Sequence, residues 1–317
     1  MIQTVLRDAP SVWKLLKGVI CIFKPAGVSP LGVRRMLVSK LADELNELKC
    51  REPIPYVTIE GDTTKNLSIS VRPSFSDHPL VVGPRYQAED IKCYPISRLG
   101  FNTSGVLLAG LNSGIAEAVE LRDSLTIRTY KIYGELGYST DTNFKTGKVI
   151  ERSKYDRIYR GMIDKWCASI QASHQSKMFE FSGVNLQSQE AYDLAVKGLI
   201  RPKMKEVLIY NLKCTEFKPP YFTIEVQCVN EFEEYLTLLI HEIGYKLHSN
   251  ATCIGIKCIR HTLFTINDAL LLKHVKLEHV IDNLSNCRSI LGKYSDSFNS
   301  PHLVNIDRNE IATTQQQ

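Results

Sequence analysis

Apolar and polar residues follow two different periods along the chain, and together they predict both strands and helices. Compact apolar runs at residues 18–23 and 106–111 predict buried strands, because each has the length of a strand and is bounded by turn-forming residues. Polar and apolar residues alternate over 129–137, 206–214 and 222–229, which is typical of strands with one buried face. Further strands are predicted over 251–266, and helical patterns cover residues 31–48, 113–124, 162–172, 189–199, 231–247 and 267–283. Because strands and helices are interspersed, we expect an α+β fold.

The same pattern divides the chain into three stretches. Residues 1–17 carry three cationic side chains, one acid and several apolar residues, so they are either an N-terminal arm or a short amphipathic import segment. One domain is expected over residues 18–284. Within it, residues 49–90 are predicted to form an irregular insertion with short strands, because five of the 13 prolines lie there. Residues 285–317 are polar and end in Thr-Thr-Gln-Gln-Gln, which predicts a mobile tail.

Composition narrows the class of protein only slightly. With 317 residues, 44% of them hydrophobic, the chain is long enough to bury a core. The net charge of +5 permits a nucleic-acid partner without indicating one. The nine cysteines are scattered and include no Cys-x-x-Cys, so neither a disulfide framework nor a metal site is indicated. No apolar run approaches the roughly 20 residues of a membrane-spanning helix, and we expect a soluble protein of a reducing compartment, with no membrane span.

Two sequence blocks carry most of the chemical information. Residues 97–108 read Ser-Arg-Leu-Gly-Phe-Asn-Thr-Ser-Gly-Val-Leu-Leu. They resemble the active-site loop of pseudouridine synthases, which reads roughly His-Arg-Leu-Asp-x-x-(Thr/Ala)-Ser-Gly-(Leu/Val)-Leu. Residues 24–29, Lys-Pro-Ala-Gly-Val-Ser, resemble the motif that precedes this loop in the TruB family of these enzymes. Both blocks also occur in the RluA family, so they do not distinguish the two families.

The second half of the chain favours the TruB family. Blocks similar to TruB motifs lie at residues 128–142, 189–195, 226–247 and 259–264, and the RluA signature Gly-Arg-x-His-Gln-Ile-Arg is absent. Three further blocks, at residues 73–84, 173–175 and 197–202, are similar to the mitochondrial TruB-like paralogue of animals, a mitochondrial mRNA pseudouridine synthase. The chain is therefore identified as a member of the TruB family that most resembles this paralogue group.

This resemblance implies a fold, a location and a set of partners. The fold would be the catalytic domain of pseudouridine synthases, with a large mixed, mainly antiparallel sheet flanked by helices and loops and no clear PUA domain after it. The protein would act in the mitochondrial matrix on RNA (mRNA, rRNA or tRNA), with mitochondrial RNA-processing proteins as further partners. The reaction of the family turns uridine into pseudouridine and needs no cofactor and no metal.

The resemblance also assigns roles to three positions of the site. In the family an aspartate attacks or deprotonates the sugar or the base, a tyrosine stacks on the flipped base, and an arginine pairs with the aspartate. Here Tyr130 stands at the stacking position, Gly100 at the aspartate position and Thr237 at the arginine position. An arginine without its aspartate would be a costly unpaired charge in a partly buried pocket. The absence of both partners therefore predicts an abandoned active site, with no catalytic residue intact.

Four cations in or beside the motif blocks are the candidates for phosphate contacts: Lys24, Arg98, Arg128 and Arg260. A solvated protein surface explains such residues equally well. Three functions stay open at this point. The leading hypothesis is a TruB-like protein that binds RNA and has little or no synthase activity. The alternatives are an active mitochondrial RNA pseudouridine synthase that uses another acid and a non-catalytic assembly subunit.

Overall fold

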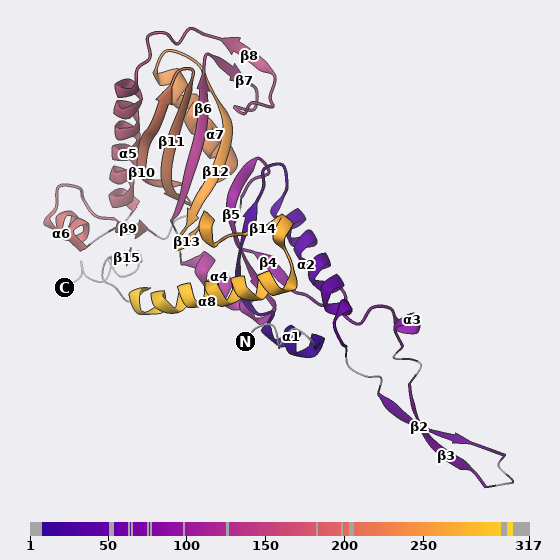
Figure 1. Ribbon diagram of the computed structural model, residues 1–317. Helices are drawn as coiled ribbons and strands as arrows, with labels where there is room; N and C mark the ends of the chain where they lie inside the picture. Colours follow the sequence, from indigo (N-terminus) through magenta and orange to yellow (C-terminus); the bar gives the residue numbers. More distant parts are fainter. Residues whose placement is uncertain are drawn as a thin grey trace.

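The computed structural model in Figure 1 describes residues 8–298 and 303–306. The gaps within this range are residues 51–53, 63, 65, 75, 77, 98, 125–126, 182, 198 and 203–205. Of the candidate site residues, only Arg98 lies outside the described part.

The centre of the fold is a mixed sheet of nine strands among the described residues. Across it lie β10 (Leu208–Lys218), β11 (Tyr221–Val229), β6 (Arg128–Leu136), β12 (Ala251–His261), β5 (Thr103–Leu111), β1 (Gly18–Lys24) and β14 (Leu270–Leu271), with β4 (Cys93–Pro95) beside β5 and β13 (Phe264–Thr265) beside β12. Among the described strand pairs of this sheet, only β12–β5 and β1–β14 are parallel. The predicted α+β fold with a mixed, mainly antiparallel sheet is confirmed.

Helices flank this sheet (Figure 1). The apolar side chains between the helices and the sheet form the main core. The helices that pack on the sheet are α5 (Arg160–Phe181) on β10, α7 (Glu233–Lys246) on β12, α8 (Leu277–Phe298) on β1, α4 (Ile115–Asp123) on β5, and α2 (Pro30–Glu47) beside β4. Short elements complete the chain: the helix α6 (Gln189–Lys197), 3-10 turns at Asn112–Gly114, Ile266–Asp268 and Leu272–His274, and the strand pairs β7–β8 (Tyr138–Thr140, Val149–Arg152) and β9–β15 (Leu199–Pro202, Leu303–Ile306). No helix within the described ranges is both long and apolar enough to cross a membrane.

The first described helix, α1 (Ala9–Leu15), is part of the folded body. Asp8 caps it by accepting a hydrogen bond from the backbone of Ser11, and Ala9, Val12 and Leu16 are fully buried in the main core. Residues 1–7 lie outside the described part. The prediction that residues 1–17 are an arm or an import segment is not tested by this packing.

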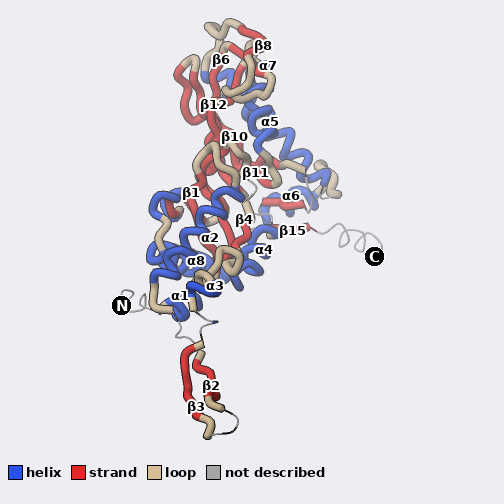
Figure 2. Tube along the Cα trace, turned by 90° about the vertical axis from the view of Figure 1, so that its right-hand side faces the viewer, coloured by secondary structure: helices blue, strands red, loops and turns tan. Residues whose placement is uncertain are grey.

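The segment predicted as an insertion, residues 49–90, contains a hairpin that projects away from the body (Figures 1 and 2). Its strands are β2 (Pro55–Glu60) and β3 (Ser68–Pro73), and the short helix α3 (Pro79–Val82) follows them. The strands pair only with each other, and their side chains are mostly exposed. Among the described residues, this hairpin therefore adds little to the buried core.

The C-terminal part differs from the prediction. For the described residues, the expected bounds of a short helix over 267–283 and a tail from residue 285 are wrong, because α8 runs from Leu277 to Phe298 and β15 follows it. Leu277, Val280, Leu284 and Cys287 recur at helical spacing and are buried in the main core. The apolar period continues past residue 285 although most of the residues around it are polar, and polar composition alone suggested a tail. Residues 307–317 lie outside the described part.

Truncation tests directly whether the folded domain ends at residue 284, as predicted, or continues through α8. Ending the chain after Leu284 should lower the free energy of unfolding by about 2–4 kcal/mol, since it removes the buried Cys287 and the half-buried residues that follow. Denaturant unfolding would measure the loss. A chain that ends after Ile306 keeps both α8 and β15, so it is the matched control and should unfold like the full chain. Equal stability of all three proteins would contradict the packing role of α8.

Candidate functional site

The loop that precedes β5 is held from one side by a buried lysine at the end of β1. Lys24 has no exposed surface, and its Nζ donates to the carbonyl oxygens of Thr103 (2.6 Å), Pro25 (3.1 Å) and Phe101 (3.2 Å). Burial lowers the pKa of Lys24 to about 8, and the negative charge of Glu233 opposes this shift. The ammonium group of Lys24 therefore stabilises the loop by binding its backbone carbonyl oxygens.

The same loop is held from the other side by the first residue of α7. The carboxylate of Glu233 accepts four hydrogen bonds: Oε1 from the amide N (3.2 Å) and Nδ2 (3.0 Å) of Asn102, and Oε2 from the amide N (2.8 Å) and Oγ1 (2.6 Å) of Thr103. A carboxylate offers about four acceptor positions. Glu233 is consequently saturated with donors.

The side chain of Glu233 lies where a side chain on residue 100 would lie. A Cβ atom added to Gly100 would be 2.5 Å from the Cβ of Glu233 and still closer to its carboxylate, well inside van der Waals contact. The backbone of Gly100 is not in the left-handed region, so its conformation would accept another residue. The space that Glu233 fills therefore explains a glycine at this position.

A second acid, Glu231, forms a buried cluster with Tyr130 and Arg128. The hydroxyl of Tyr130 donates to Glu231 Oε1 at 2.5 Å, and Arg128 Nε lies 2.7 Å from the same oxygen. Burial raises the pKa of Glu231, which Arg128 opposes. Burial also disfavours the charge of Arg128, but Tyr130 and Glu231 outweigh it and raise the pKa of this guanidinium, which stays charged.

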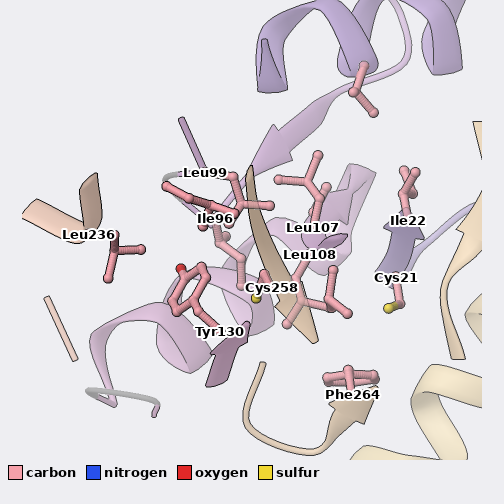
Figure 3. Packing of buried hydrophobic residues seen from close by; sticks show 14 of the residues in the cluster. Cys21, Ile22, Ile96, Leu99, Leu107, Leu108, Tyr130, Leu236, Cys258 and Phe264 are labelled. Carbon is pink, nitrogen blue, oxygen red and sulfur yellow. The ribbon is translucent and has the colours of Figure 1, made fainter. Parts of the chain in front are cut away.

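Tyr130 is packed inside the protein in this structure. It comes from the inward face of β6, is only 2% exposed, and its ring lies between Leu236 of α7 and Cys258 of β12, near Leu99 (Figure 3). The space that these elements enclose is too small for a water molecule; its lining consists of Leu99, Gly100, Thr103, Tyr130, Glu231, Phe232, Glu233 and Leu236. Stacking of Tyr130 on a base, as predicted, would require this space to open.

The position predicted for the arginine lies on α7, one turn after Glu233. Thr237 is buried, and its hydroxyl donates to the carbonyl of Glu234 at 2.9 Å. Residues four apart share one face of a helix, so Thr237 and Glu233 point to the same side of α7. Glu233 thus shares a helix face with Thr237 and also lies against Gly100.

The predicted phosphate contacts are dispersed. Lys24 is buried under the loop, and Arg128 is paired with Glu231 and only 13% exposed, so either group would have to leave its partners to reach a phosphate. Arg260 is exposed on β12, where its Nε donates to the carbonyl of Thr262 at 2.6 Å. These assignments stay predictions, and the exposed Arg260 is the best placed of them.

Residues that the sequence did not single out make up much of this site. Glu231 and Glu233 stand in the run Asn-Glu-Phe-Glu-Glu at the start of the predicted helix, where acids are common because they favour a helix N-terminus. That local signal gave no hint of their partners more than 100 residues away. Two neighbouring aromatic side chains, Phe101 and Phe232, are 57% and 52% exposed beside the hydrogen bonds of Glu233.

Two buried histidines near this region should make the protein sensitive to acid. His261 contacts Ser97 Oγ through Nδ1 (2.9 Å), and His174 contacts the hydroxyl of Tyr235 through Nε2 (3.2 Å). Burial lowers the pKa of His261 to about 3, with a further contribution from Arg128, and lowers that of His174 to about 4, with a further contribution from Lys177.

The unfolded chain binds protons at these histidines from about pH 6.5, whereas the folded chain does not. Their contribution to stability is therefore complete above pH 6.5 and is lost as the pH falls toward 4 and then 3. We expect the thermal midpoint to fall over this range, and His261→Gln to make the fall shallower. His279→Gln, which changes an exposed histidine, should keep the slope of the unmodified protein. Equal slopes for all three proteins would contradict the burial of a neutral His261.

Comparison with known proteins extends over most of the chain. The family described as "TruB family pseudouridylate synthase (N terminal domain)" matches residues 97–233. Mitochondrial pseudouridylate synthase TRUB2 of Xenopus tropicalis is 36% identical over 289 residues, which are 89% of this chain and 88% of that protein. TRUB2 of Homo sapiens is 34% identical over 275 residues, 84% of this chain and 82% of that protein. A chain in the crystal structure of the archaeal box H/ACA sRNP Nop10-Cbf5 complex matches with a TM-score of 0.42 and 15% identity, over 82% of this chain and 53% of that chain.

Proposed function

Because the chain belongs to the TruB family of pseudouridine synthases, we propose that it is a mitochondrial RNA-binding protein that has lost the family's aspartate-dependent isomerisation of uridine. The mitochondrial location is taken from the names of its TRUB2 relatives, and the matrix is the compartment that we expect. The family acts on RNA, and this chain would bind RNA at the surface where the loop before β5 meets the start of α7.

One observation is the main support for the proposed loss of isomerisation. Residue 100 has no side chain, and the acid in its space, Glu233, has both carboxylate oxygens occupied by hydrogen bonds to Asn102 and Thr103. A nucleophile or general base needs a free lone pair directed at its substrate. The uncharged Thr237 adds to this, because no arginine is present there to pair with an acid.

Phe101 and Phe232 are the groups that we assign to RNA bases. Both are more than half exposed, and each directly precedes in the chain a residue of the hydrogen bonds that join the loop to α7. The centroids of the Phe232 and Tyr235 rings lie 6.0 Å apart. Unstacked RNA bases bind to such aromatic surfaces. Phe101 and Phe232 would stack on bases while Tyr130 stays buried, and Arg260 would add a phosphate contact.

The proposal is tested by incubating the purified protein with mitochondrial RNA and counting pseudouridine by mass spectrometry, while a filter assay measures RNA retention. We expect retention that weakens with salt and no new pseudouridine. Formation of pseudouridine would establish the competing function, an active synthase with a displaced acid. Glu233 is the specific candidate for that acid, because its carboxylate fills the space of the lost one. Failure to retain RNA even at low salt would favour an assembly subunit.

The aromatic contacts give a separate prediction. Phe101→Ala and Phe232→Ala should each weaken RNA retention about fivefold or more, since stacking of one base contributes about 1–3 kcal/mol. The matched control is Tyr245→Ala, which removes an aromatic side chain that is 70% exposed at the other end of α7. If the control weakens retention as much as the two phenylalanine variants, this surface is not the binding site.

A further inference from the structure

We infer that Glu233 supplies, from α7, the carboxylate that the loop of residues 100–103 needs, in place of an aspartate at position 100. Glu233 is then a positioning residue, and Gly100 and Glu233 form a matched pair. The pairing of Gly100 with Glu233 is a property of the folded chain and does not depend on RNA. Any effect of this pairing on RNA binding rests on the proposed function.

The loop needs an acceptor because its amide groups point inward. The backbone N–H groups of Asn102 and Thr103 lie in a part-buried setting, where an unpaired donor is unfavourable. An aspartate accepts hydrogen bonds from amides two and three residues further along its own chain, as in Asx-turns. An aspartate at position 100 would accept hydrogen bonds from these two amides within the loop. Glycine has no acceptor on its side chain. Glu233 accepts both hydrogen bonds instead, from 131 and 130 residues further along the chain.

The local and the distant carboxylate exclude each other in space. Any Cβ on residue 100 would overlap both the carboxylate and the Cβ of Glu233. Since the conflict reaches the Cβ of residue 233, alanine there would not relieve it, and only glycine would. The two residues are therefore alternative solutions to one requirement, each of which demands a minimal side chain at the other position.

The charges around the loop support the same assignment. Lys24 binds the carbonyl oxygens of Phe101 and Thr103, while Glu233 binds the amide groups of Asn102 and Thr103. The loop thus lies between a buried cation and an anion, each bound to the backbone groups that suit its charge. A neutral residue at position 233 would leave Lys24 without the opposite charge that favours its ionised form.

The test is hydrogen exchange at the amides of Asn102 and Thr103 in the free protein, with thermal melts to confirm folding. We expect Glu233→Gln, which has nearly the same shape, to speed exchange of these amides about tenfold, because its NH2 group faces donors. Glu234→Gln changes the next, exposed residue and should leave exchange unchanged. The exchanged pair Gly100→Asp with Glu233→Gly should restore protection, and Glu233→Gly alone should not.

Unchanged exchange in the Glu233→Gln variant would overturn the inference. A folded exchanged pair that stays unprotected would overturn it as well, because aspartate would then not be an alternative source of the carboxylate. If Glu233→Gly alone fails to fold, the Glu233→Gln variant and the exchanged pair still decide. No RNA is present in these measurements, so RNA retention and pseudouridine counts report separately on the proposed function.

Discussion

Replacing Glu231 with alanine is expected to lower the free energy of unfolding by about 3–5 kcal/mol, the usual cost of removing one partner from a buried ion pair. Glu231 is almost fully buried, and its Oε1 binds both the hydroxyl of Tyr130 and the guanidinium of Arg128. Without it, Arg128 keeps its charge beside the core and Tyr130 loses its acceptor. Both losses act at the junction of β6 with α7, where the site is built.

Denaturant unfolding of the variant and the unmodified protein would measure this change. Glu234→Ala is the matched control: it removes an exposed acid three residues away on α7 and should change the free energy of unfolding by less than about 0.5 kcal/mol. The double variant Arg128→Leu with Glu231→Met should recover part of the lost free energy of unfolding, because no buried charge is then left unpaired. A loss below about 1 kcal/mol for Glu231→Ala would show that the cluster is not a buried ion pair in solution.

The second large effect concerns reconstruction of the family's site. Gly100→Asp with Thr237→Arg restores the two residue types that the family uses, yet we expect at best weak pseudouridine formation. Glu233 fills the space of the new aspartate and would repel its charge. Adding Glu233→Gly should raise the yield by about a hundredfold or more over this double variant, because a positioned acid then has room to act.

Mass spectrometry of RNA treated with the double and the triple variant would measure this difference. Glu234→Gly in place of Glu233→Gly is the matched control, since it adds the same flexible residue to the same helix turn without clearing the space. Family-like turnover by the double variant would contradict the steric role of Glu233. An inactive but folded triple variant would show that other parts of the pocket have also changed.

Local periodicity identified most of the fold because it depends only on neighbouring residues. The alternation over residues 129–137 and 222–229 corresponds to β6 and β11, and the helical pattern over 231–247 corresponds to α7. The one large error, α8, arose where polar composition was given more weight than the apolar period that includes Leu284 and Cys287. The motif blocks identified the family, which the comparisons confirm.

The sequence by itself therefore determined the family, the α+β class, and the absence of an aspartate at residue 100 and of an arginine at residue 237. Only the tertiary structure decided which acids lie beside the loop and beside Tyr130. Glu233 reaches the loop of Asn102 and Thr103, and Glu231 reaches Tyr130 and Arg128, across more than 100 residues of chain. Contacts of this kind depend on how β5, β6 and α7 are brought together, and no local period or motif records the direction in which a side chain reaches across a folded core.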